Sequence, residues 1–199
     1  MLQYSTTHRT NDMTDIVTDL GATSYLLIYT GAVPANCAAA ATGTLLVSLP
    51  CSATFGTVAS GVLTASAITG TAAAATGSAG YWRLCTSSAG TTCVAQGLCY
   101  GQSTLATSAA TATGNVLTFA ATSPIVAGQS VSGTNIPAGT YVLDVTSTTV
   151  TLNQNVTSTG VASGATITFG GDLTFTSGVA LTSGTVVNIS SLVLTANGA

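Results

Sequence analysis

The amino-acid sequence predicts a mainly β protein, an antiparallel β-sandwich of the jelly-roll or immunoglobulin-like kind, with a short N-terminal helix and an inserted small β-domain. Three observations support this fold class. More than half of the 199 residues are Ala, Gly, Ser or Thr. One segment alone has helical periodicity, and elsewhere short runs rich in Thr and Val alternate with Gly and Pro turns. Side chains branched at Cβ pack well on a pleated sheet, and Gly, Pro and Ser suit turns.

The helix is expected over residues 6–20. Apolar residues occupy one helical face at the spacing i, i+3, i+4 and i+7: Met13, Ile16, Val17 and Leu20. The residues that could cap its start are Ser5, Thr6 and Thr7. Gly21 suits the left-handed position that often follows the last turn.

A parent β-domain is expected from strands on both sides of the insertion. Those before it are 23–30, 44–49, 61–68, 81–85 and 92–100, and those after it are 172–176, 185–189 and 192–195. Residues 69–80, rich in Thr, Gly and Ala, are expected to form a loop. The sequence Ser87-Ser88-Ala89-Gly90 predicts a hairpin between 81–85 and 92–100.

The composition changes after about residue 105, which indicates an insertion. Residues 114–169 contain about five short strand-like segments, enough for a small independent β-unit. We therefore expect an N-terminal helical arm (1–22), a parent β-sandwich (23–105 with 171–199) and an inserted domain (106–170). An insertion is tolerated at an exposed loop tip because it disturbs few buried backbone hydrogen bonds.

The chain is poor in charge. From Gly21 onward only Arg83, Asp144 and Asp172 are charged, whereas a free globular domain uses about a quarter of its residues for charge. We expect neighbouring subunits to cover such a surface in an assembly. Two cationic residues form no basic patch for nucleic acid, and no apolar run approaches the ~20 residues that span a membrane. Neither nucleic acid nor membrane is therefore an expected partner.

The cysteines are too few and too irregularly spaced for a disulfide scaffold: Cys37, Cys51, Cys85, Cys93 and Cys99. With one His, at position 8, and no Cys-x-x-Cys, no zinc site is predicted. If residues 88–90 form the turn, Cys85 and Cys93 face each other across the hairpin. A disulfide there in an oxidising medium and a pair of buried thiols are both open, and buried thiols are favoured because free Cys behaves as a small hydrophobe.

The ionisable residues of the first twenty positions allow functional and structural interpretations. His8 and Asp12 lie four positions apart, as in half of a catalytic triad, and Asp12, Asp15 and Asp19 could bind calcium. No positioned nucleophile accompanies His8, and the loop pattern of a calcium site is missing. A solvated helix face or a subunit contact is therefore favoured.

Trp82, next to Tyr81, could stack on a sugar or a receptor, or it could anchor the core or an interface. The second interpretation is favoured because aromatic residues bury the most area. Asp144 and Asp172 are isolated acids, so paired-carboxylate chemistry is not predicted. We expect no catalytic, cofactor-binding or metal-binding residues.

Several segments resemble small virion proteins of tailed bacteriophages. They are SYLLIYTG at 24–31, PANC at 34–37, GTLLV at 43–47, AGYWR at 79–83 and SAGTT at 88–92. The shorter relatives lack the insertion and continue almost directly to a stretch like GDLT at 171–174 and a final strand like SLVLT at 191–195. The insertion itself resembles a β-module of phage structural proteins, at 133–140 and 149–152.

The resemblance implies a non-enzymatic virion component, a head decoration or cement protein. The implied partners are the major capsid protein and further copies of the chain, with a trimer as one option. The implied location is the capsid surface, after assembly in the bacterial host cytoplasm. The expected contact residues are His8, Arg9, Asp12, Asp15, Asp19, Tyr81, Trp82 and Arg83.

The alternative is a tail-fibre or adhesin module that binds a host-surface glycan through Trp82, Tyr81 or the inserted domain. The number of copies per particle separates the two, because hundreds indicate the head and a handful indicate the tail. A glycan-degrading enzyme is disfavoured by the shortage of acids and histidine.

Overall fold

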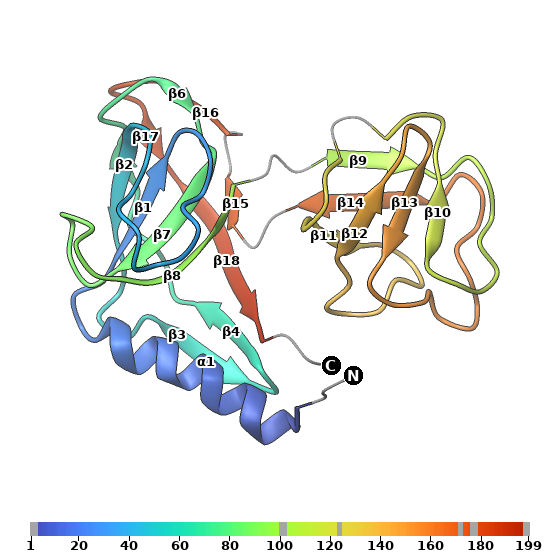
Figure 1. Ribbon diagram of the computed structural model, residues 1–199, viewed down its shortest axis with the longest axis horizontal. Coiled ribbons are helices and arrows are strands. Elements are labelled where there is room, and N and C mark those ends of the chain that lie inside the picture. The colour runs from blue at the N-terminus through green and yellow to red at the C-terminus, as the bar shows by residue number, and fades with distance from the viewer. Residues whose placement is uncertain (1–3, 100–102, 123–124, 171–172, 176–178, 197–199) are drawn as a thin grey trace. The chain divides into compact units, whose positions relative to one another are not determined.

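The computed structural model describes residues 4–99, 103–122, 125–170, 173–175 and 179–196. The chain divides into two compact units (Figure 1). Unit 1 comprises Met1–Tyr100 and Asp172–Ala199, and unit 2 comprises Gly101–Gly171. All strand pairs between described residues are antiparallel. The prediction of a mainly β, antiparallel, sandwich-like protein with one short helix is confirmed.

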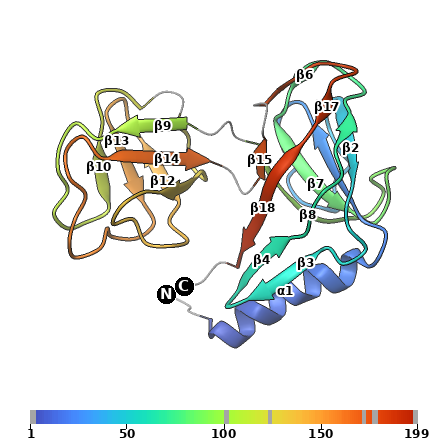
Figure 2. The ribbon, with the colours of Figure 1, turned by 180° about the vertical axis from the view of Figure 1, so that it is seen from behind.

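Helix α1 (Thr6–Leu20) has the predicted bounds. The Ser5 hydroxyl caps its start by accepting a hydrogen bond from the backbone N–H of His8 at 3.1 Å, and Gly21 follows its end with φ of 62°. Met13 and Leu20 are buried in the core of unit 1, and α1 lies along β3 and β4 (Figure 2). The helix is therefore packed as part of unit 1, and the expectation of a separate N-terminal arm is wrong for residues 6–20.

The first sheet of unit 1 has the strand order β2-β1-β7-β8. Its strands are β1 (Tyr25–Tyr29), β2 (Leu45–Pro50), β7 (Tyr81–Cys85) and β8 (Cys93–Leu98). Each lies within or overlaps a predicted strand, because their aromatic and branched residues suit a sheet. All five residues of β7 are buried, so both faces of this strand are covered.

The second sheet of unit 1 has the order β15-β18-β4-β3. Its strands are β3 (Gly56–Ala59), β4 (Val62–Ala65), β15 (Leu173–Phe175) and β18 (Ile189–Thr195). Two short pairs join the segments before and after unit 2, β5 (Thr71–Ala72) with β17 (Val186–Val187) and β6 (Gly77–Ser78) with β16 (Ala180–Leu181). The expectation of a plain loop at 69–80 is wrong at residues 71–72 and 77–78, which pair with partners more than 100 positions away.

The two faces of the first sheet bury different clusters. Alternate side chains of a strand point to opposite faces. One face packs into the main core of unit 1, which the second sheet and α1 complete, through Leu26, Ile28, Trp82 and Leu84. The other face carries a smaller cluster of Leu27, Tyr29, Tyr81 and Cys85.

Unit 2 is a small β-unit of two three-stranded sheets, β10-β13-β12 and β11-β14-β9. The strands are β9 (Ser103–Ala106), β10 (Val116–Thr118), β11 (Ser130–Ser132), β12 (Val142–Val145), β13 (Thr149–Leu152) and β14 (Thr166–Gly170). Its core includes Phe119 and Phe169, whose rings meet edge to face with centroids 5.6 Å apart. Because β9 pairs with β14, the first strand of this unit begins at Ser103, before the expected start of the inserted domain at residue 106.

Candidate functional site: a buried arginine among three cysteines

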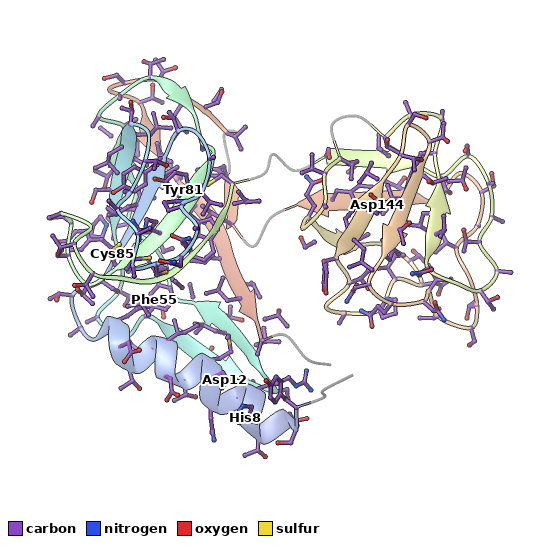
Figure 3. All side chains as sticks on the ribbon, in the orientation of Figure 1. His8, Asp12, Phe55, Tyr81, Cys85 and Asp144 are labelled. Atoms are coloured by element: carbon purple, nitrogen blue, oxygen red, sulfur yellow. The ribbon has the colours of Figure 1, made fainter. Side chains whose placement is uncertain are left out.

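The connection between β1 and β2, residues 31–43, folds over the outer face of the first sheet, and we call it the covering loop. Side chains of β7 and β8 hold its backbone. The Tyr81 hydroxyl accepts a hydrogen bond from the N–H of Thr42 at 2.8 Å and donates one to its carbonyl at 2.5 Å. Gln96 donates to the carbonyl of Pro34 at 2.7 Å. These bonds make the loop a fixed cover for the cluster around Tyr81 and Cys85, which Figure 3 labels.

Arg83, on β7, is the charged residue beneath the covering loop. Its side chain is 2% exposed, and its Nη2 donates to the carbonyl oxygens of Cys37 at 2.5 Å and Ala39 at 3.0 Å. A guanidinium stays protonated in proteins. Between described residues the one ion pair is His8–Asp12, so Arg83 has no carboxylate partner among them.

Three cysteines surround Arg83. Cys85 and Cys93 are opposite each other in the β7–β8 pairing, as the hairpin predicts. Cys93 Sγ also lies 2.7 Å from Cys37 Sγ in the covering loop and 3.3 Å from the carbonyl oxygen of Ala95. All five cysteines of the chain are free thiols. Cys85 is buried, whereas Cys37 and Cys93 are partly exposed.

The three thiols have unequal acidity. Hydrogen bonding from the Cys85 thiol, together with that from Cys37 and the positive charge of Arg83, lowers the pKa of Cys93 to about 6 against the opposing effect of burial. Burial and the neighbouring Cys93 raise the pKa of Cys37 to about 12. The hydrogen bond to Cys93, and then burial, raise the pKa of Cys85. Of the three thiols, Cys93 is therefore the one whose deprotonation is favoured by its surroundings.

Cys93 and Arg83 each favour the charged form of the other. Burial alone would lower the pKa of Arg83, but its hydrogen bond with Cys93 and the charges of the nearby sulfur atoms raise it. A buried charge is stabilised only when it is paired and hydrogen-bonded. Because the thiolate is the nucleophilic form of cysteine, the pairing also gives Cys93 the properties of a reactive thiol.

Sequence reasoning missed Cys37, which lies far from Cys93 along the chain and reaches it only because the covering loop folds back. One signal could have indicated the site. In the strand YWRLC, Tyr81, Arg83 and Cys85 share one face by alternation, and an arginine within an apolar strand requires a cover that supplies polar partners.

The predicted contact residues of the helix lie mainly on its outer side. His8, Asp15 and Asp19 are exposed, and His8 Nε2 is 3.7 Å from Asp12 Oδ1 (Figure 3). The Arg9 Nη2 donates to the Thr6 hydroxyl at 3.4 Å. This face offers a small group of acids and one weak ion pair for a contact.

The other three predicted contact residues are interior. Tyr81 is 0% exposed, and Trp82 and Arg83 are each 2% exposed. These side chains cannot form a surface contact, and the stacking of Trp82 or Tyr81 on a glycan is excluded in this fold. The physical reason is that β7 is covered by the main core on one face and by the covering loop on the other.

The remaining sequence candidates do not form a site. Among the described residues no group of three or more His, Cys, Asp or Glu side chains is arranged to hold a metal ion. Asp144 is exposed on β12, and Asp172 lies outside the described residues. No described helix has the length and apolar character needed to cross a membrane.

No family model, curated protein or solved structure matches this chain.

Proposed function

We propose that this protein is a structural component of a tailed-phage virion, a decoration or cement protein that stabilises the head shell. The observation that carries the proposal is the placement of charge. Of the three charged residues that follow Gly21, Arg83 is buried and Asp144 is exposed, while Asp172 is outside the described residues. The described β surface therefore presents almost no ionic group to water, which is atypical of a free domain and promotes association.

A surface of hydroxyls and small side chains suits contact with other subunits. Burying an ion in an interface costs several kcal/mol per unpaired ion, whereas a hydroxyl can donate or accept a hydrogen bond with whichever group it meets. Large apolar side chains also remain exposed on both units: Leu98, Val116, Val126, Tyr141, Leu143 and Val186. Such residues add apolar area to a contact without requiring charge complementarity.

The outer side of α1 supplies the ionic part of the contact. Asp12, Asp15 and Asp19 are the acids of this helix, and a charged group of this kind fixes orientation and register more than it adds affinity. Several weak contacts with the major capsid protein and with copies of the chain then combine through high effective concentration. This is the mechanism by which the protein would hold adjacent capsid subunits together.

The first test compares particles with and without this protein under heat and osmotic shock. Complete particles should survive harsher treatment, and equal survival would refute the proposal. Counting copies per particle in the same preparation separates head from tail, because a handful of copies would instead support the tail-fibre or adhesin alternative.

The second test measures rebinding of the protein to particles that lack it. A variant combining Asp12→Asn, Asp15→Asn and Asp19→Asn should bind about tenfold more weakly at low salt, since exposed ionic contacts contribute about 0.2–1 kcal/mol each. Asp144→Asn, which removes an exposed acid outside the helix, is the matched control. Equal loss of binding free energy per charge removed in the two variants would show that net charge, and not the helix face, determines binding.

A further inference from the structure

We propose that Cys37 and Cys93 form a redox-active pair, in which Cys93 attacks small-molecule disulfides and Cys37 closes an intramolecular disulfide that locks the covering loop to β8. The inference does not depend on the function proposed above. It rests on three observations: the contact of the two sulfur atoms, the partial exposure of both residues, and the position of Arg83 beside them.

The first observation is proximity. Cys37 Sγ and Cys93 Sγ are 2.7 Å apart, whereas nonbonded carbon atoms, which are smaller than sulfur, prefer about 3.5–4.0 Å. The covering loop is held at this position by the bonds from Arg83 to the carbonyls of Cys37 and Ala39. The sulfur of Cys37 is thus delivered to Cys93 by an arrangement that does not itself require a covalent bond.

The second observation is access. Cys37 and Cys93 are partly exposed, whereas Cys85, the other neighbour of Cys93, is buried with 0% exposure. A small disulfide can therefore approach Cys93 from the side of the covering loop. The same exposure lets the small thiol leave when Cys37 attacks the mixed disulfide.

The third observation is electrostatic. Arg83 lies next to Cys93 without a carboxylate among the described residues to neutralise it. The other titratable groups that face Cys93 are Cys85 from β7, Cys37 from the covering loop and Tyr29 from β1. Each of these three keeps its proton at neutral pH, because the pKa of each is raised. Arg83 is consequently the one cation facing the Cys93 sulfur, and it favours the nucleophilic thiolate.

The reaction is a pair of thiol–disulfide exchanges. The Cys93 thiolate attacks one sulfur of a low-molecular-weight disulfide, whose S–S bond breaks and releases one thiolate. Cys37 then loses its proton to that thiolate, and its sulfur attacks Cys93 Sγ and releases the second small thiolate. In sum, the Cys93 thiolate and the Cys37 thiol lose two electrons and one proton, and the small disulfide is reduced to one thiol and one thiolate, which takes a proton from the solvent.

The arginine pattern of the chain makes the bond easy to map. Arg9 and Arg83 are the two tryptic sites of a chain that has no Lys. Digestion therefore places Cys37 and Cys51 on the fragment 10–83, and the other three cysteines on the fragment 84–199. A Cys37–Cys93 bond links the two fragments, whereas a Cys85–Cys93 bond stays within one.

The experiment treats the full-length reduced protein with oxidised glutathione at pH 7, alkylates the remaining thiols in denaturant, and digests without reductant. We expect free thiols to fall from five to three and the two fragments to be linked. Retention of five thiols, or a bond confined to 84–199, would overturn the proposal. This measurement needs no variant, so a folding defect cannot obscure it.

Variants then test the separate roles. In Cys37→Ser, Cys93 should accumulate one glutathione as a mixed disulfide and the fragments should stay unlinked. In Cys51→Ser, the matched control on the same fragment, the link should form as in the unmodified protein. Loss of the link in Cys51→Ser, or its persistence in Cys37→Ser, would refute the assignment of Cys37.

Discussion

Arg83 should be the main attachment of the covering loop to the sheet, and Arg83→Met tests this directly. Methionine keeps an unbranched, flexible side chain of similar reach, so the change removes the charge and the donors with little loss of packing. The bonds lost are those from Nη2 to the carbonyls of Cys37 and Ala39. Cys93 would then lose its positive neighbour, and its pKa should rise towards the usual value.

The magnitude follows from these bonds. A hydrogen bond made by a charged group contributes about 1.5–3 kcal/mol. Both carbonyls belong to residues that are only partly buried, so water replaces part of the loss, and the removal of a buried charge offsets some more. We expect the free energy of unfolding of unit 1 to fall by about 2–3 kcal/mol.

Urea denaturation followed by tryptophan fluorescence measures this change. Trp82 is the single tryptophan of the chain and is buried in unit 1, so its emission reports on that unit. With a slope of about 1–3 kcal/mol per molar urea, the midpoint should fall by about 1 M or more. Arg9→Met is the control, because the hydrogen bond from Arg9 Nη2 to the Thr6 hydroxyl is long at 3.4 Å. A loss below about 0.5 kcal/mol, the usual range for surface changes, or one equal to that of Arg9→Met, would refute the reasoning.

Three further predictions concern the thiol and the two cores. The pKa of Cys93 is lowered to about 6, so its alkylation rate should fall about tenfold from pH 7 to pH 5. The rate of an ordinary thiol of pKa ~8.5 would fall about a hundredfold over the same range. A hundredfold fall for Cys93 would contradict the thiolate assignment. Gly97→Ala places a Cβ 2.6 Å from the Trp82 ring and should cost unit 1 about 1–3 kcal/mol by overpacking, seen as a lower urea midpoint. Phe169→Ala should cost unit 2 about 3–5 kcal/mol and leave the Trp82 transition unchanged, whereas a coincident shift would show that the units unfold together.

Local patterns predict much of the fold. Helix α1 has the expected bounds because Met13 and Leu20 mark one buried face and Ser5 caps the start. Strand β7 matches the expected 81–85 because its aromatic and apolar run is bounded by turn residues. These elements form through interactions between residues close together in the sequence, so local patterns are enough to predict them.

Long-range pairing is what the sequence does not reveal. The strands β5 and β6 have two residues each and pair with β17 and β16, more than 100 positions later, so no period marks them. Long-range contact is also the reason why the sequence did not predict the part of the site that Cys37 contributes. Cys85 and Cys93 are predicted to face each other by the hairpin, but Cys37 arrives through a loop held by side-chain bonds to its backbone. The sequence also did not predict that the covering loop lies over the second face of β7. The interior position of Tyr81 therefore could not be predicted.

The ion pair and the proposed disulfide compete for the same sulfur. By the chain-entropy relation, closing a loop between residues 37 and 93 would add about 4 kcal/mol to stability, but the oxidised form loses the thiolate that neutralises Arg83. Stabilising the reduced form makes a cysteine pair easier to reduce, so this bond should be more reducible than one between ordinary thiols. Arg83→Met should then shift the equilibrium with glutathione towards the disulfide. Each 1.4 kcal/mol of lost thiolate stabilisation lowers the reduction potential by about 30 mV and raises the oxidised-to-reduced ratio about tenfold. Titrating the linked fragments against the glutathione ratio measures the shift. An unchanged or higher potential in Arg83→Met would mean that the lost attachment of the covering loop outweighs the lost stabilisation of the Cys93 thiolate.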